Sequence, residues 1–207
     1  MITVHHLNNS RSQRILWLLE ELGVPYEIAF YQRNAQTNLA PPELTKVHPL
    51  GKSPVITDGD LTIAESGAIV DYLIRVHGNG SLAPPPGRDH EIYTEWLHYA
   101  EGSAMLPLML NLYVGRLGEA GAPLHPRIAS ELANHLGYIN AALKCRNYLM
   151  GSDLTGADIL LIFVGEFARA FKKLDGLPEV AAWVARFQAR PAYRRALEKG
   201  GAYHFAA

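Results

Sequence analysis

Residues 48 to 73 carry the side chains best suited to holding a small anionic ligand. Glu65 and Ser66 stand directly before a run of apolar residues at helical spacing, so the pair is predicted to begin a helix. A helix N-terminus presents unpaired N–H groups and a partial positive charge, and a carboxylate could dock there with the Ser66 hydroxyl as a further donor. Upstream, Pro54 stands where a strand should start, and its missing N–H leaves that position unable to pair in a ladder.

Simpler interpretations compete with these ligand roles. Taken alone, a glutamate and a serine at a helix start are more often ordinary capping residues than a ligand site. His5 and His6 are adjacent on a predicted strand and point to opposite faces, so we do not expect them to share a metal ion. The sequence has neither an HExxH motif nor paired cysteines, and we expect no metal cofactor.

The elements that must position these residues begin with a β-α-β unit, followed by β-β-α. Apolar residues at helical spacing predict a helix from Ser12 to a C-terminal cap at Gly23. Residues 32–50 are polar and broken by prolines, so we expect a loop with at most one short helix. Asp58 and Gly59 are predicted to form the turn of a hairpin. The predicted strands are residues 2–7, 26–31, 55–57 and 61–63.

The second half of the chain predicts helices only. Pro107 should kink or split the first of them. The apolar run at residues 159–164 could be a strand, but Thr155 and Asp158 form a capping box before it, so a buried helix is predicted. Five basic residues near the C-terminus are expected to make a solvated face: Arg186, Arg190, Arg194, Arg195 and Lys199. The other predicted helices are residues 89–118, 126–147, 178–189 and 191–199.

Turn and breaker residues concentrate in NGSLAPPPGR, which is typical of a connection between domains. We therefore expect a first domain at residues 1–80, a linker at 81–88, and an all-helical second domain at 89–207. With 207 residues the chain is long enough for two small domains with their own cores.

The composition excludes some classes of partner. The chain is 48% hydrophobic and 19% charged with a net charge of −1, which gives no electrostatic case for nucleic acid or an anionic membrane. Its one cysteine, Cys145, cannot form an intramolecular disulfide, which favours a reducing compartment. No apolar signal core or long apolar run is present, and we expect a cytoplasmic protein.

Taken together, these features resemble the soluble glutathione S-transferases along essentially the whole chain. The segments that carry the resemblance are HPLGKSP, AESGAI and the buried helix opened by Thr155-Gly-Ala-Asp158. The segments NNSRSQRILWLLEELGVPYE and PPELTKVHPLGKSP look closest to a bacterial and fungal branch. The resemblance implies an α/β thioredoxin-like N-terminal domain (βαβ-ββα) followed by an all-α C-terminal helical bundle.

The resemblance also implies how glutathione would be held. Pro54 would be a cis-proline, and the backbone of Ser53 would pair with the cysteinyl backbone of glutathione. Ser66 and its helix N-terminus would take the γ-glutamyl carboxylate, and Glu65 the ammonium group. Lys52 would lie toward the glycine carboxylate. The last of these glutathione-binding residues is His48, in an assisting role.

Thiol activation requires a donor at the start of the first helix. A thiol of ordinary pKa, about 8.5, is mostly protonated at neutral pH, whereas the thiolate is the nucleophile. The position that carries a catalytic serine or cysteine in several branches of the family falls on Asn9, with Ser10 next to it. Because an amide is a weaker donor than a well-placed hydroxyl, we expect Ser10 to be the main donor and Asn9 the assistant. Ser12 is expected to cap the helix.

The leading functional prediction is a glutathione transferase with a detoxification role, working as a homodimer on small electrophiles with glutathione as co-substrate. Because of Asn9, glutathione-dependent peroxide or disulfide reduction is an alternative activity. The sequence has no N-terminal cysteine that could form a mixed disulfide with glutathione. A noncatalytic interaction module with the same fold is the third alternative. Five residues could line a pocket for an apolar second substrate, or serve in helix packing or dimer contacts: Tyr93, Met105, Met109, Leu112 and Tyr113.

Overall fold

The computed structural model describes residues 1–206, which form two compact units. The first unit joins Met1–Ala83 with the chain from Gln188 onward, and the second is Pro84–Phe187. The first boundary falls inside the predicted linker. The second differs from the prediction, since the last residues of the expected helical domain belong to the first unit.

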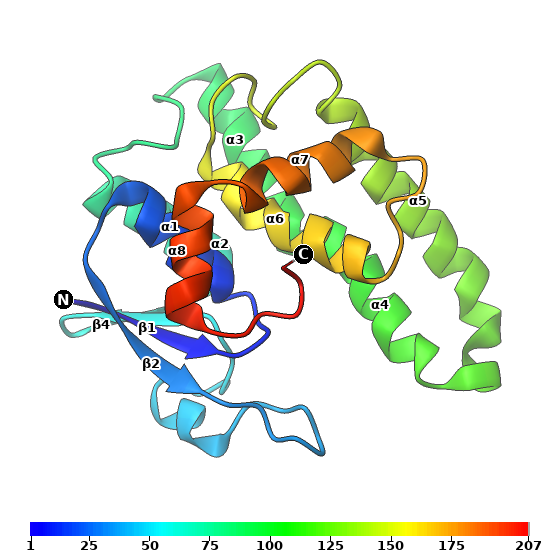
Figure 1. Cartoon of the computed structure of the whole chain (residues 1–207), viewed down its shortest axis with the longest axis horizontal. Helices are drawn as coiled ribbons and strands as arrows, with labels where there is room; N and C mark the ends of the chain where they lie inside the picture. Colours follow the sequence, from blue (N-terminus) through cyan, green and yellow to red (C-terminus); the bar gives the residue numbers. More distant parts are fainter. Residues whose placement is uncertain (207) are drawn as a thin grey trace. The chain divides into compact units, whose positions relative to one another are not determined.

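A four-stranded mixed sheet organises the first unit, in the order β2-β1-β3-β4 (Figure 1). β2 runs parallel to β1, as a β-α-β connection requires, and β3 and β4 follow antiparallel. The predicted βαβ-ββα order is confirmed, but the hairpin turn lies one residue later than expected. Asp58 pairs with Leu61, so Gly59 and Asp60 are the turn residues, and Gly59 takes the positive φ of 61°. The strands are Ile2–Leu7 (β1), Tyr26–Tyr31 (β2), Val55–Asp58 (β3) and Leu61–Ala64 (β4).

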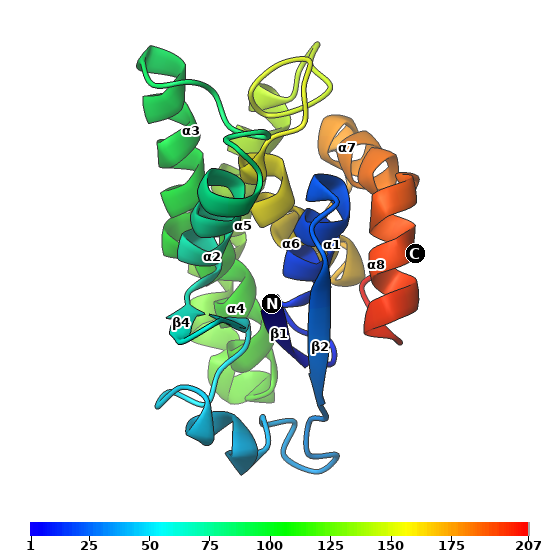
Figure 2. The ribbon, with the colours of Figure 1, turned by 90° about the vertical axis from the view of Figure 1, so that its left-hand side faces the viewer.

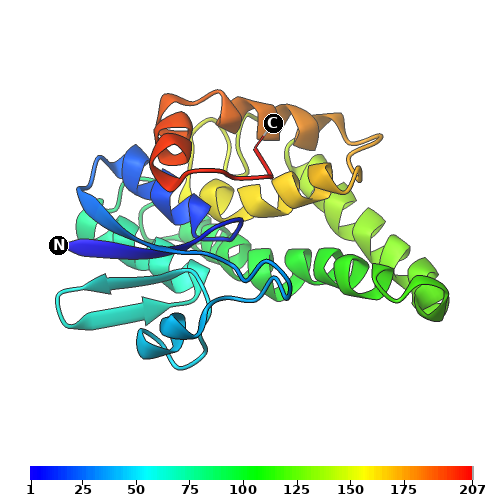
Figure 3. The ribbon, with the colours of Figure 1, turned by 60° about the horizontal axis from the view of Figure 1, so that its bottom comes forward.

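Helix α1, Gln13–Leu22, is buried along most of its length, and Gly23 caps its C-terminus with a φ of 66°. Residues 32–50 contain one short 3-10 turn, Pro42–Lys46, as predicted. In Figure 3 α1 lies above the strands and this turn below them. Helix α2, Ser66–Tyr72, continues into a π-helical turn at Leu73–His77.

Helix α8, Pro191–Gly200, packs against α1, and Figures 1 and 2 show the two helices side by side. Its apolar face is buried there, with the ring of Tyr193 5.6 Å from that of Trp17. The absence of a side chain at Gly200 leaves room for α1, because an added Cβ would lie 2.6 Å from Oε1 of Gln13. This packing explains why the end of the chain belongs to the first unit.

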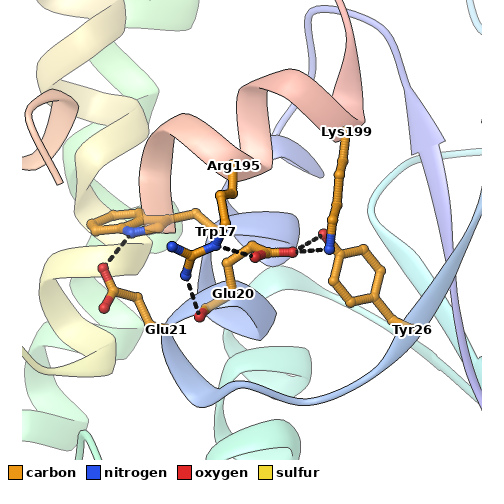
Figure 4. Close-up of polar contacts among 6 residues, drawn as sticks. All are labelled: Trp17, Glu20, Glu21, Tyr26, Arg195 and Lys199. Carbon is orange, nitrogen blue, oxygen red and sulfur yellow. Dashed lines mark hydrogen bonds and ion pairs between the residues drawn. The ribbon is translucent and has the colours of Figure 1, made fainter. Parts of the chain in front are cut away.

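Three of the five basic residues near the C-terminus, Arg190, Arg195 and Lys199, pair with two glutamates of α1, which corrects the prediction of a solvated face for them. Arg194 is exposed, as predicted, and Arg186 donates to the carbonyl of Asn147 at 2.7 Å. Glu20 accepts hydrogen bonds from Arg195 (2.8 Å), from Lys199 and from Tyr26 of β2 (2.9 Å), as Figure 4 shows. Glu21 accepts two from Arg190, at 2.6 and 2.8 Å, and one from Trp17 at 2.8 Å. Sequence periodicity alone could not reveal these bonds, because the partners lie far apart in the chain.

The second unit is helical throughout its described elements. Pro107 has no N–H for the carbonyl of Ser103, and the turn before it is π-helical, so the predicted kink takes the form of a local change in hydrogen bonding. Within residues 1–206 no helix is long and apolar enough to cross a membrane. The elements are α3 (Arg88–Tyr99), the π turn Ala100–Ala104, α4 (Met105–Gly115), the 3-10 segment Gly118–Leu124, α5 (His125–Ala142), α6 (Gly156–Ala170) and α7 (Pro178–Gln188).

Helix α6 is the core of this unit and is buried from Gly156 to Ala168. The predicted capping box is confirmed, since Asp158 accepts hydrogen bonds from the backbone and hydroxyl of Thr155, each at 3.0 Å. Asp158 also accepts from the backbone of Leu149 at 2.9 Å and from the indole of Trp183 at 3.1 Å. Burial raises the pKa of this carboxyl, and the four donors act against that rise.

Candidate functional site

The loop before β3 brings Ser53 and Pro54 to the end of the sheet next to β1. Their peptide bond is cis, as the family resemblance implies. The sheet pairing ends at His5 and Val55, and the Ser53 hydroxyl donates to the carbonyl of His5 at 2.9 Å. Within residues 1–206 no backbone hydrogen bond involves Ser53. An extended peptide could therefore use this backbone edge.

Glu65 and Ser66 lie at the start of α2, as predicted. Glu65 has φ 69° and ψ 122°, a conformation rare for a residue with a Cβ and typical of functional sites. Ser66 is only 3% exposed, and its hydroxyl has no hydrogen-bond partner in the part of the chain that the structure describes. The hydroxyl is not among the fully buried polar atoms that lack a partner, so a ligand can reach it, and its position at a helix N-terminus suits an anion.

Lys52 and His48 lie in the loop that leads to the cis bond. Lys52 is exposed, and its ammonium group has no ion-pair partner among the described residues, so it is available to an anion. His48 is half-buried, and its Nδ1 accepts the backbone N–H of Leu50 at 3.4 Å. That contact stabilises the turn and engages one of the two ring nitrogens of His48.

Ser10 is 4% exposed and belongs to a buried chain of hydrogen bonds beneath the start of α1. Its Oγ lies 2.7 Å from that of Ser12, which in turn lies 2.9 Å from Nδ1 of His6. Ser12 is at the N-cap position, but its hydroxyl accepts from the backbone of Leu7 at 3.3 Å instead of capping the helix. Ser12 is therefore the N-cap residue, as predicted, but its side chain does not make the capping hydrogen bond.

The protonation state of His6 determines which group donates and which accepts at each bond of this buried chain of hydrogen bonds. Burial lowers the pKa of His6 to about 4, although a hydrogen bond to the backbone of Gly200 acts to raise it. The imidazole is therefore neutral at neutral pH. Since Nδ1 faces Ser12, we assign the proton to Nε2, toward the carbonyl of Gly200, which leaves Nδ1 as an acceptor. Ser12 then donates to His6, and Ser10 donates to Ser12. The Ser10 proton points into the protein, while its Oγ remains 3.5 Å from that of Ser53.

Asn9 is more accessible than Ser10 and has a left-handed φ of 51°. Arg33 holds the backbone on one side, since its guanidinium donates to the carbonyls of Asn8 (3.0 Å) and Asn9 (3.3 Å). The Asn9 amide contacts His204, whose backbone N–H lies 2.8 Å from Oδ1 and whose Nδ1 lies 3.3 Å from Nδ2. No pattern in the sequence indicates this contact between Asn9 and the C-terminal segment.

The five residues predicted for a second-substrate pocket lie in the second unit and have different environments. Tyr93 and Met105 are buried at 1% exposure, so they are core residues of this unit and do not line an open pocket. Met109 and Leu112 are half-buried, and Tyr113 is exposed. Leu112 lines a hollow of about 550 Å³, together with Ile128, Leu132 and Phe171 among others.

Comparisons with known proteins agree with the fold. The family model "Glutathione S-transferase, N-terminal domain" matches residues 1–75, and "Glutathione S-transferase, C-terminal domain" matches residues 103–191. The chain is 36% identical to glutathione S-transferase 3 of Schizosaccharomyces pombe, over 96% of this chain and 88% of that protein.

Two solved structures are similar to this chain over nearly its whole length. One is a glutathione S-transferase from Actinobacillus pleuropneumoniae, with a TM-score of 0.88, 31% identity, and coverage of 99% of this chain and 95% of that one. The other is a glutathione transferase family member from Pseudomonas fluorescens with two glutathione bound, with a TM-score of 0.80, 30% identity, and coverage of 95% and 92%.

Proposed function

Since the chain belongs to the glutathione S-transferase family, we propose that its first unit holds glutathione at Ser53, Pro54, Glu65 and Ser66 and activates the thiol at Asn9. The protein is a glutathione transferase, which joins the thiol of glutathione to a small electrophile. The observation that carries the binding assignment is the Ser66 hydroxyl, which has no partner among the described residues and lies at a helix N-terminus beside the positive φ of Glu65.

Each polar end of glutathione has a complementary group. The γ-glutamyl carboxylate meets Ser66 and the N-terminus of α2, and Glu65 pairs with the ammonium group. The cysteinyl backbone pairs with the unused backbone of Ser53, and Lys52 reaches the glycine carboxylate, with His48 assisting from the same loop. The thiol then lies near the start of α1, because Ser10 of that loop is within 3.5 Å of Ser53.

The chemical step needs the thiolate. The thiol proton leaves to solvent, a sulfur lone pair forms the new bond to carbon, and the electron pair of the bond that breaks leaves with the leaving group or enters the electrophile. A donor to the sulfur anion lowers the thiol pKa. A hydrogen bond to a charged group contributes about 1.5–3 kcal/mol, which corresponds to roughly one to two pKa units.

We propose Asn9 as the main donor and Ser10 as the assistant, the reverse of the order expected from sequence. This order is supported by the direction of donation in the buried chain of hydrogen bonds, in which the Ser10 hydroxyl donates its proton to Ser12. The Nδ2 group of Asn9 carries two hydrogens, of which one is engaged with His204. Ser10 supports the loop from beneath and adds a donor only if its hydroxyl rotates.

The pKa of glutathione bound to single variants tests this order. In Asn9→Ala the thiol pKa, followed by the ultraviolet absorbance of the thiolate, should rise by about one unit or more, and turnover at neutral pH should fall about tenfold. Ser10→Ala should raise the thiol pKa by less. Ser81→Ala, at an exposed position, provides a control. A larger rise in Ser10→Ala than in Asn9→Ala would restore the original order. If neither variant changes the thiol pKa, thiol activation at this loop is wrong.

The proposal extends to a homodimer that acts in the cytoplasm on apolar electrophiles as a detoxifying enzyme. Leu106, Leu110, Tyr113 and Leu117 repeat along α4 and just beyond it, at spacings that share one helix face, and are between 40% and 59% exposed. An apolar stripe of this kind suits a second copy of the chain. Met109 and Leu112 remain candidates for contact with the electrophile.

A further inference from the structure

We propose that the C-terminal segment, residues 201–206, orients the amide of Asn9 toward the glutathione thiol, with His204 as the positioning residue. The inference rests on the proposed role of Asn9 as thiolate donor. The segment follows α8, which the ion pairs with Glu20 and Glu21 hold against α1, so it belongs to the same compact unit as the thiol site. Asn9 and His204 are separated by almost the whole chain and meet through two contacts.

The first contact determines which way the amide faces. The backbone N–H of His204 is a fixed donor, and it lies 2.8 Å from Oδ1 of Asn9. If the amide were flipped, its NH₂ group would face this N–H and two donors would oppose each other. The oxygen of the amide therefore faces the C-terminal segment.

The second contact follows from the first. With Oδ1 engaged, Nδ2 is the donor toward Nδ1 of His204 at 3.3 Å, so the imidazole accepts at Nδ1 and carries its proton at Nε2. Nδ2 has a second hydrogen, for which the described residues provide no acceptor. This hydrogen is the one available to a sulfur anion.

The segment is anchored well enough to hold an amide in place. Tyr203 is buried, and its ring packs edge-to-face on Phe205 at 5.3 Å. The amide of Gln188 donates to the carbonyl of Phe205 at 3.4 Å. Arg33 holds the backbone of Asn9 from the other side. The side-chain torsion of Asn9 is then the remaining freedom, and the contacts with His204 remove it. A donor already oriented toward the thiolate loses less entropy when the bond forms.

Three substitutions of His204 separate its two contacts. His204→Pro removes the backbone N–H, His204→Ala removes only the ring acceptor, and His204→Asn offers a side-chain oxygen in place of Nδ1. We expect His204→Pro to raise the pKa of the bound thiol by about half to one unit, a three- to tenfold loss of thiolate at neutral pH. His204→Ala should give a smaller rise, and His204→Asn should restore the wild-type value. The exposed His98→Ala provides a matched control.

The same substitutions in an Asn9→Ala background test whether His204 acts through Asn9. There they should leave the thiol pKa unchanged. Calorimetry with an S-alkylated glutathione, which has no thiol to ionise, should give the same affinity for all variants, since Glu65 and Ser66 are untouched. If Asn9→Ala raises the thiol pKa but His204→Pro and His204→Ala do not, the positioning role is wrong and the proposed function stands. If Asn9→Ala itself has no effect, the proposed role of Asn9 fails, and the positioning role fails with it.

Discussion

At Glu65 the backbone adopts a conformation that any residue with a Cβ disfavours, directly before a helix whose first hydroxyl has no protein partner. Strained residues of this kind cost about 1–3 kcal/mol and persist where the surrounding structure or a ligand requires them. Here the conformation lets the chain leave β4, turn sharply into α2 and present the Glu65 carboxylate to solvent. The strain and the binding role of Glu65 are therefore separable by mutation.

Substitution of Glu65 by glycine and by alanine should separate the backbone strain from the binding role of the carboxylate. Both substitutions remove the carboxylate, so both should weaken glutathione binding about tenfold or more, measured by calorimetry. Glu65→Gly also removes the Cβ that disfavours a φ of 69°, so it should be about 1 kcal/mol more stable than Glu65→Ala in thermal or chemical unfolding. This is the opposite of the usual order of the two residues. Equal stabilities would mean that the backbone at position 65 is not strained.

At the scale of the elements, the attachment of α8 to α1 depends on carboxylates that are largely covered. Burial raises the pKa of Glu20, but hydrogen bonds from Lys199, Arg195 and Tyr26 outweigh it, so the pKa lies below its ordinary value. Folding therefore favours the ionised form. The stability that Glu20 contributes is complete above the ordinary glutamate pKa of about 4.3 and is lost as the pH falls through it toward the lower folded pKa.

Glu20→Gln should reveal this contribution as a stability difference that depends on pH. At neutral pH the variant should be about 1–2 kcal/mol less stable than the wild type, after allowance for the partly exposed partners. The difference should shrink as the pH falls below about 4. Unfolding curves across this range measure it, with the exposed Glu27→Gln as control. A difference that does not vary with pH would show that the ion pairs do not attach α8.

For the whole molecule, the exposed stripe on α4 leads to a prediction about assembly. Light scattering of the wild type should give twice the chain mass of 22.8 kDa. Leu110→Glu would put a charge in the centre of the stripe, and burying it against a second copy would cost several kcal/mol, so this variant should be monomeric at micromolar concentration. Leu39→Glu, at an exposed loop position of the first unit, should remain dimeric. A wild type that is monomeric at all concentrations would contradict the homodimer.

The features that sequence predicted well are those decided by neighbouring residues. The ranges of β1 and β2 follow from short β-branched and aromatic runs, and the capping box of Thr155 and Asp158 spans three positions. The cis bond before Pro54 and the helix start at Ser66 followed from local motifs and the family resemblance. These preferences act within a few residues, so they can be inferred before any packing is known.

Long-range contacts decided the rest. The chain itself determined a thioredoxin-like order of elements, a helical second half and the residues that could hold glutathione. Only the tertiary structure decided that α8 returns to the first unit, that Ser10 joins a buried chain of hydrogen bonds through Ser12 to His6, and that His204 lies against Asn9. The physical reason is that a hydrogen bond or an ion pair depends on the positions of both partners, and here folding brings together partners from opposite ends of the chain.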